Sequence, residues 1–512
     1  MGVVVAARVS FEANGQHLVY ALDDPYIHMA IAKNLALHGV FGLTRYEFSS
    51  STSSPLWTLL LAASYRLVGV KDWVPGIWAV GFAFSALYTT NVLCRFFGLR
   101  LFPRFITCCA VLYFTPLLPL VATGMEHAMH LFLVLLLILL TVRFLDIPSR
   151  LAAVFMCSAG LLATATRYET LFLVAPLVCL LLHSRHWVAG SAFAISSALP
   201  VFAYGLFSLS NGSYFLPNSL MLKGHFPAGG GYRAAVDLMG YHGFGILTAT
   251  DHLFSISVML LFGAYCFHKQ RRVLFAIVMS VMCALLLHLQ FASTGWFFRY
   301  EAYLVGVSMV LLGCLYLGPE REGSCLTSCN HVLPRVSLLV CIVLLLWPLH
   351  RRAKEALEKT VPISNHIYQQ QFQMGQFLKN MYEPGVRVGV NDVGAVAYYA
   401  DVAVLDLWGL GSIEVARAKR EGMYDAESLE RLLKTHKTDV VIVFTNWFPN
   451  MLPSNLVSVC SWTTSSNYSS RAVTFFGVSP EKAVLLENRL RQYQTNLPEC
   501  VTVSYMTDAR SH

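Results

Sequence analysis

The sequence predicts a mainly α-helical, polytopic membrane protein: a bundle of ten or eleven spans with outer juxtamembrane helices, followed by a C-terminal α/β domain. Hydrophobic residues make up 56% of the 512 residues and charged residues 13%, about half the share typical of soluble domains, roughly 25%. Apolar runs close to the roughly 20 residues of a spanning helix recur until 349, and hydropathy then drops. We therefore expect a transmembrane domain over 1–352, with its first outer loop at 22–72, and a soluble domain over 353–512.

The first outer loop contains an acidic pair at the start of a predicted helix. Asp23 and Asp24 are followed at once by Pro25, which suits the first position of a helix. We expect Asp24 to be the N-cap, because its side chain can accept hydrogen bonds from the free N–H groups of the first turn. Apolar residues follow at helical spacing, and Gly39 is expected to end the helix.

A second start signal, Ser54-Pro55, opens the segment Leu56–Val70. This segment is short and contains Arg66, so it is predicted to lie in the interface rather than to cross the bilayer. Ten spans are expected after it. They are Trp73–Leu99, Phe105–Ala122, Ala128–Leu145, Leu151–Thr166, Leu171–His183, Trp187–Leu209, Leu253–Phe267, Val273–Leu289, Ala302–Leu317 and Val336–Leu349.

The basic residues between the spans predict the orientation. With Asp23 outside, the cytoplasmic ends carry the excess of Lys and Arg that is typical of inner loops. The net charge of +8 is thus read as a topological signal, and no nucleic-acid partner is expected. The acidic pair and the C-terminal domain would face the periplasm or exterior of a multi-pass cell (inner) membrane protein. The basic ends are Arg95, Arg100, Arg104, Arg143, Arg150, Arg185, Lys269, Arg271, Arg272, Arg321 and Arg335.

Polar clusters lie at the predicted outer ends of the spans. Ionisable residues at membrane depth are functional candidates, although any one of them could be a solvated span end or a structural ion pair. Four clusters on one face favour a shared polar cavity. Their members are Glu126 with His127, Arg167 with Tyr168 and Glu169, Asn218 with Ser219 and Lys223, and Arg299 with Tyr300 and Glu301.

The C-terminal region reads as a small α/β domain of a normal single-domain size. Its glycines between 391 and 411 lack the spacing of a phosphate cradle and are expected to form turns. Strands are predicted at Val386–Val390, Val402–Leu407, Asp439–Phe444 and Ala472–Gly477, and helices at Pro362–Tyr382, Ala426–His436 and Glu481–Gln494.

Several of these stretches resemble one family. DDPYIHMAIAKNL, followed by SSPLWTLLLAASYRLVG, is similar to the first outer loop of the GT-C glycosyltransferases that use polyprenyl-phosphate sugars, including arabinofuranosyltransferase-like and mannosyltransferase-like enzymes. TGMEHAMHLFL, TRYE, LPNSLMLKG and RYEAYL resemble its later motifs, with His127, Tyr168 and Ser219 as departures. The match covers roughly Leu22 to Leu410. The family has a full span before its acidic pair, so either a first span is missing from this N-terminus, which we favour, or the protein lacks that span.

The resemblance implies an inverting hexosyl- or pentosyltransferase of GT-C type. Its donor would be a polyprenyl-phosphate-linked sugar and its acceptor a cell-envelope glycan, lipid or protein, with membrane lipids around it. Asp23 is expected to be the catalytic base and Asp24 mainly the cap. No metal is obligatory, although the pair could bind Mg²⁺ or Mn²⁺. Donor phosphate and substrate contacts are expected from Lys33, Glu126, Arg167, Glu169, Asn218, Lys223, Arg299 and Tyr300.

Two other classes of function fit the same composition. A lipid-linked glycan ligase or polymerase would share this geometry and commonly use a pyrophosphate donor. A lipid or sugar transporter tends to show internal repeats and polar residues in mid-span, and neither is visible here. The sequence leaves the sugar, acceptor, linkage, oligomeric state and role of the C-terminal domain open.

Overall fold

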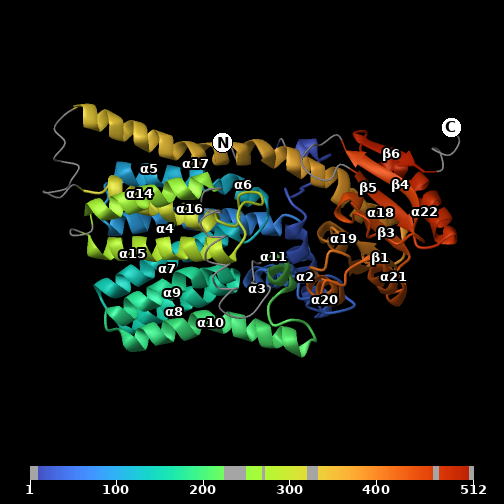
Figure 1. The fold of residues 1–512 in the computed structure, drawn as a ribbon, viewed down its shortest axis with the longest axis horizontal. Coiled ribbons are helices and arrows are strands. Elements are labelled where there is room, and N and C mark those ends of the chain that lie inside the picture. The colour runs from blue at the N-terminus through green and yellow to red at the C-terminus, as the bar shows by residue number, and fades with distance from the viewer. Residues whose placement is uncertain are drawn as a thin grey trace.

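The protein is elongated, with a helical bundle at one end and an α/β domain at the other (Figure 1). The computed structural model describes residues 8, 10–223, 250–267, 271–319, 332–464 and 472–506; within these, the side chains of 223, 267 and 332–340 are not described. Loop helices α2, α3, α11 and α20 lie where the two parts meet. This junction contains residues 22–72, the segment predicted to be the first outer loop.

Each of the ten predicted spans lies on a helix. Among the described residues, four helices are long and apolar enough to cross a bilayer, namely α4 (Val74–Phe96), α7 (His127–Asp146), α10 (Trp187–Ser210) and α15 (Arg272–Phe291). The shorter apolar helices are α5 (Leu101–Phe114), α6 (Leu117–Ala122), α8 (Arg150–Thr166), α9 (Leu171–His183), α14 (Asp251–Phe267) and α16 (Ala302–Tyr316).

One predicted span, Phe105–Ala122, is divided into α5 and α6. The break falls at Thr115 and Pro116, because proline has no N–H to continue the hydrogen-bond ladder.

The first outer loop forms two helices, α2 (Asp24–His38) and α3 (Pro55–Val68), as expected. Gly39 ends α2 in the left-handed region, at φ 71°, where its amide bonds back to the last turn. The predicted cap is wrong. Asp23 holds the N-cap position and makes no side-chain capping bond, whereas Asp24 is already helical. Both carboxylates contact other parts of the molecule instead, Asp24 at Arg299 and Asp23 at Gly394.

A single long helix joins the bundle to the C-terminal domain. α17 runs from Val332 to Ile367, past the expected domain boundary at 352, and contains Pro348 and Pro362. It continues through a π-helical turn, η3 (Tyr368–Phe372), into α18 (Gln373–Met381). One continuous helical segment, α17 to α18, thus contains both the predicted span Val336–Leu349 and most of the predicted helix Pro362–Tyr382 (Figure 1).

The C-terminal domain is built on a six-stranded sheet with the order β2-β1-β3-β5-β4-β6. β1, β2 and β3 are parallel, while β5, β4 and β6 are antiparallel. The four predicted strands are confirmed as β1 (Arg387–Val390), β2 (Ala403–Asp406), β3 (Val440–Val443) and β5 (Ala472–Gly477), whereas β4 (Val457–Thr464) and β6 (Val501–Tyr505) were not predicted.

Several helices accompany the sheet in the described residues, and α18 is one of them. α21 (Ala426–Thr435) and α22 (Pro480–Tyr493) correspond to predicted helices, and α19 (Gly394–Tyr399) and α20 (Ile413–Arg420) are additional. Tyr26 and Met29 of α2 share one hydrophobic core with Val396 of α19 and Phe377 of α18. This shared core fixes the first outer loop against the C-terminal domain.

Candidate functional site

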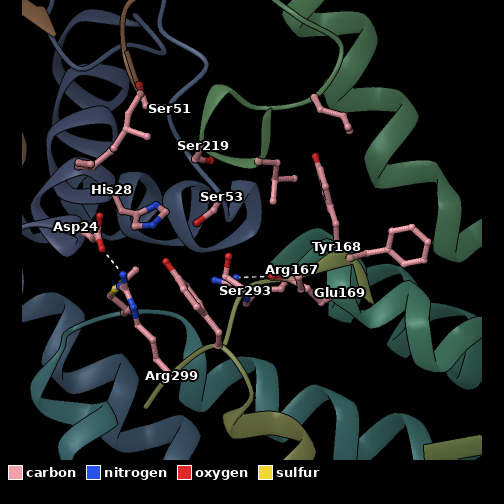
Figure 2. A pocket seen from close by; sticks show the side chains of 18 of the residues that line it. Asp24, His28, Ser51, Ser53, Arg167, Tyr168, Glu169, Ser219, Ser293 and Arg299 are labelled. Carbon is pink, nitrogen blue, oxygen red and sulfur yellow. Dashed lines mark hydrogen bonds and ion pairs between the residues drawn. The ribbon is translucent and has the colours of Figure 1, made fainter. Parts of the chain in front are cut away.

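A cavity of about 330 Å³, here called the first cavity, lies beside the N-terminal half of α2. Figure 2 shows Asp24, His28, Arg167 and Arg299 around it. Its other walls are largely apolar. They include Ile27, Met125, Leu171, Phe172, Val201, Leu216, Leu220, Phe291 and Leu410, the last from the C-terminal domain. The first cavity therefore has an apolar body and one strongly charged end.

Asp24 and Arg299 form an ion pair at the charged end, between Oδ2 of Asp24 and an Nη of Arg299 (Figure 2). Arg299 is only 2% exposed, and its Nε–H donates to the carbonyl of Trp296 at 3.2 Å. The Trp296 indole N–H donates to the same Asp24 oxygen at 3.3 Å. Asp24 is thus held in a fixed position at the cavity wall.

Arg167 lies between two glutamates. One Nη donates to Glu126 at 2.8 Å and the other to Glu169 at 2.5 Å, and all three side chains are buried. The ring of Tyr300 faces both guanidinium groups, 5.7 Å from Arg167 and 5.2 Å from Arg299. The predicted clusters around 126, 167 and 299 are therefore brought together in one network.

His28 is a cavity residue that the sequence reading missed. It lies four residues after Asp24, so the two side chains share one face of α2. Its Nδ1 is 3.0 Å from Thr52 Oγ1 and 3.1 Å from Thr58 Oγ1, and its Nε2 is 3.8 Å from Glu126. Burial lowers the pKa of His28, which keeps the ring neutral near pH 7. The i, i+4 spacing was the available signal.

Several polar atoms around the first cavity have no hydrogen-bond partner among the described residues. They are Arg167 Nε, the Tyr168 hydroxyl and Ser219 Oγ, all on lining residues. Buried polar groups of this kind usually bind a ligand or water. Asn218 is fully buried beside them with both side-chain polar atoms unpartnered, while its backbone N–H donates to the Ser50 carbonyl at 2.9 Å. These groups could bind the polar part of a ligand.

Asp23 lies outside the first cavity. Its two carboxylate oxygens accept the backbone N–H groups of Gly394, at 2.6 Å, and Ala395, at 2.8 Å, at the start of α19. Burial first, and then the neighbouring Asp392 carboxylate, raise the pKa of Asp23 well above its usual range. Gly394, expected in a turn, begins a helix instead. The first-ranked catalytic candidate is therefore attached to the C-terminal domain.

Of the two predicted lysines, only Lys33 has a described side chain, and it does not extend this network. Lys33 points to the C-terminal domain, where its ammonium donates to the carbonyls of Ala397 at 3.2 Å and Tyr398 at 2.5 Å. Burial lowers its pKa to about 8. Lys33 lies more than two turns beyond Asp24 and on another face of α2, so its predicted contact with a phosphate stays a prediction. Lys223 ends α11 (Asn218–Lys223), and its side chain lies outside the described residues.

A family model described as a domain of unknown function (DUF8728) matches residues 364–490, which lie in the C-terminal part. No curated protein matches the sequence. ArnT from Cupriavidus metallidurans, in a crystal structure bound to undecaprenyl phosphate, has a similar structure with a TM-score of 0.53 and 13% identity, and the alignment covers 94% of this chain and 98% of ArnT.

The apo form of the same ArnT gives a TM-score of 0.53 at 12% identity, over 94% of this chain and 97% of that one. The chain therefore shares the fold of ArnT. The long apolar helices indicate an integral membrane protein. A shared fold does not determine the reaction, so the reaction has to be argued from the site.

Proposed function

We propose that this protein is an integral membrane glycosyltransferase that moves a hexosyl or pentosyl group from a polyprenyl-phosphate donor to a cell-envelope acceptor. The observation that carries the proposal is the first cavity, in which apolar walls lead to two buried guanidinium groups and the Asp24 carboxylate. An apolar groove suits a polyprenyl tail, and guanidinium groups suit its phosphate. The undecaprenyl phosphate bound to the similar ArnT supports this choice of ligand.

The charged end of the first cavity suits a single displacement. The acceptor hydroxyl oxygen forms a bond to the anomeric carbon of the sugar, and the bond from that carbon to the phosphate oxygen breaks. The electron pair leaves with polyprenyl phosphate, and the hydroxyl proton passes to a carboxylate. Attack opposite the leaving group inverts the anomeric configuration.

Asp24 is the proposed base. It lines the first cavity, whereas both oxygens of Asp23 already accept backbone N–H groups of the C-terminal domain. We assign Asp23 a positioning role, because it fixes the start of α2 against α19. Mg²⁺ or Mn²⁺ bound by Asp23 and Asp24 is an alternative proposal. The described residues contain no group of three or more His, Cys, Asp or Glu side chains suited to one metal ion.

The leaving phosphate would be held by Arg167 and Arg299. Arg167 has a spare Nε–H, and the hydroxyl groups of Tyr168 and Ser219 are two further donors without partners among the described residues. Lys223, four residues after Ser219, is proposed as an additional cation, as the sequence suggested. The positive-inside pattern supports an outer-face site in the cell (inner) membrane, with the acceptor a glycan, lipid or protein.

Transfer from synthetic donors tests the proposed function. The purified protein in lipid nanodiscs is incubated with a panel of polyprenyl-monophosphate pentoses and hexoses and with cell-envelope extract, and release of polyprenyl phosphate is followed. We expect release with at least one monophosphate donor. Release only from pyrophosphate-linked glycans would identify a ligase or polymerase instead, and protein-dependent movement of an intact donor across vesicles would identify a transporter.

A further inference from the structure

A second cavity, of about 230 Å³, shares Asp24 with the first and lies between the bundle and the C-terminal domain. Its wall is rich in aromatic rings from both parts of the molecule. Trp296, Phe297 and Phe298 come from the segment before α16, and Trp447 comes from the turn η4 (Thr445–Trp447) after β3. Its polar side contains the carboxyl groups of Asp23, Asp24 and Asp392, the side chains of His366 and Gln371, and the ammonium group of Lys359, which is paired with Glu355.

Two deeply buried polar atoms at this cavity have no partner among the described residues. Gln371 is 2% exposed; its Nε2 donates to Asp392 at 2.7 Å, but its Oε1 is unpartnered. His366 is 1% exposed; its Nδ1 lies 3.3 Å from Thr464 Oγ1, and its Nε2 is unpartnered. Both residues line the cavity. Because such atoms are rarely left unpaired, they indicate a ligand with hydroxyl groups or ordered water.

The combination of rings and oxygen acceptors distinguishes between ligand classes. The apolar face of a sugar ring can pack on Trp or Phe, while its hydroxyls donate to carboxylates and amide oxygens. A polyprenyl tail would leave Gln371 and His366 unpaired, at a cost for each buried polar group. An anionic ligand would meet the carboxylates of Asp24 and Asp392, and Lys359, the cation in the cavity lining, is already paired with Glu355. A neutral sugar satisfies both requirements.

We propose that the second cavity binds a neutral sugar ring of the acceptor and presents its hydroxyl to Asp24. The proposal rests on the proposed function, since it supplies the second substrate of that same reaction. Asp24 lines both cavities, so a donor in the first and an acceptor in the second meet at one carboxylate. It also gives the C-terminal domain a role, because Trp447 and Asp392 belong to it. The acceptor class is then a glycan or glycolipid with a neutral reacting sugar.

Saturation-transfer NMR on the full-length protein in nanodiscs tests this directly. The probes are methyl glycosides of glucose, mannose, galactose and arabinofuranose, with methyl glucuronide as the anionic comparison. We expect saturation of at least one neutral glycoside, a weaker signal from the glucuronide, and about a tenfold weaker Kd in both Trp447→Ala and Gln371→Leu. Trp187→Ala is the matched control, since Trp187 is 62% exposed at the start of α10.

The outcomes separate the inference from the proposed function. Citronellyl phosphate, a short soluble relative of the donor lipid, is titrated in parallel. If it binds while no glycoside does up to high millimolar concentration, the second cavity holds only water and the inference fails alone. Equal Kd values in wild type and Gln371→Leu, which is nearly isosteric, would also overturn it. Displacement of the glycoside by a polyprenyl-phosphate sugar but not by polyprenyl phosphate would assign the cavity to the donor's sugar instead.

Discussion

Asp24 and His28 face the first cavity from one side of α2, whereas Asp23 and Lys33 contact the C-terminal domain from another side. Asp24 pairs with a guanidinium group and lines both cavities, while Asp23 accepts two backbone amides and lines only the second. Successive helical residues are rotated by about 100°, so two adjacent carboxylates acquire different neighbours.

The two sides of α2 therefore have different expected roles, one in the reaction and one in holding α2 against the C-terminal domain. The first-cavity face should control turnover and donor binding, and the domain face should control stability and the placement of α2. Substitutions on the two faces can be compared within one helix, which keeps most other variables constant. We expect the effects of the substitutions to decrease from Asp24→Asn to Lys33→Met.

The largest effect is expected for Asp24→Asn. Loss of a general base typically lowers the rate by a factor of about 10²–10⁴, and the amide cannot take the hydroxyl proton. Turnover with the active donor should fall by this factor, while membrane insertion and citronellyl phosphate binding persist. Asp146→Asn, at the exposed end of α7, is the control. Normal turnover in Asp24→Asn would remove Asp24 from the chemistry.

Arg299→Lys should act mainly on the donor. Lysine keeps the charge but replaces the separate Nη and Nε donors, which bond Asp24 and the Trp296 carbonyl, by one compact ammonium group, so the phosphate contact should weaken. We expect a donor KM about tenfold higher with a smaller change in kcat. Arg143→Lys, on the exposed side of α7, should leave KM unaltered. A change in kcat alone would instead indicate that Arg299 acts only by orienting Asp24.

Asp23→Asn should reduce stability more than turnover. The new NH₂ group cannot accept a hydrogen bond, so one of the amides of Gly394 and Ala395 loses its partner. The expected cost is about 1–3 kcal/mol, measured as a lower midpoint of thermal unfolding in detergent. Asp401→Asn, on a half-exposed carboxylate of the same domain, provides the comparison. An unchanged midpoint with abolished turnover would return the base role to Asp23.

The neighbouring Asp392 should make stability depend on pH. Burial and the carboxylates of Asp24 and Asp406 raise the pKa of Asp392 to about 6. A carboxyl whose pKa is raised by folding binds its proton more tightly in the folded chain, so its contribution is greatest below about pH 4. That contribution is lost as the pH rises through about 6. Asp392→Asn should therefore flatten the unfolding midpoint between pH 4 and 7, and a profile identical to wild type would contradict this.

The sequence was sufficient to predict helices and strands wherever their pattern of residues is local. Runs of apolar residues identified the helices of the bundle, and the Pro25 and Gly39 signals bounded α2. The strand β6 could also have been found, because Val501–Tyr505 alternates apolar and polar residues. The strands and helices that were predicted correctly are those whose pattern lies within a single segment.

Local patterns could not predict the tertiary contacts of Asp23 and Asp24. Asp23 meets Gly394, which lies 371 residues later in the chain, and nothing in the local sequence indicates that contact. The ranking of Asp23 over Asp24 therefore rested on a capping rule that tertiary contacts overrode. The i, i+4 spacing of Asp24 and His28 was a local signal, because it predicts that both side chains lie on one face of α2.

The smallest effect is expected for Lys33→Met on the domain face. Its ammonium bonds two carbonyls at the end of α19, and methionine keeps the apolar stem while losing those bonds. Because the pKa of Lys33 is already lowered to about 8 by burial, part of the bond energy offsets desolvation. We expect a loss of about 1 kcal/mol or less in unfolding free energy and an unchanged donor KM. Lys434→Met, at a 70% exposed side chain on α21, is the control for loss of a surface charge. A donor KM raised several-fold in Lys33→Met, at unchanged stability, would mean that Lys33 reaches the phosphate after all and that the two faces of α2 act on one substrate.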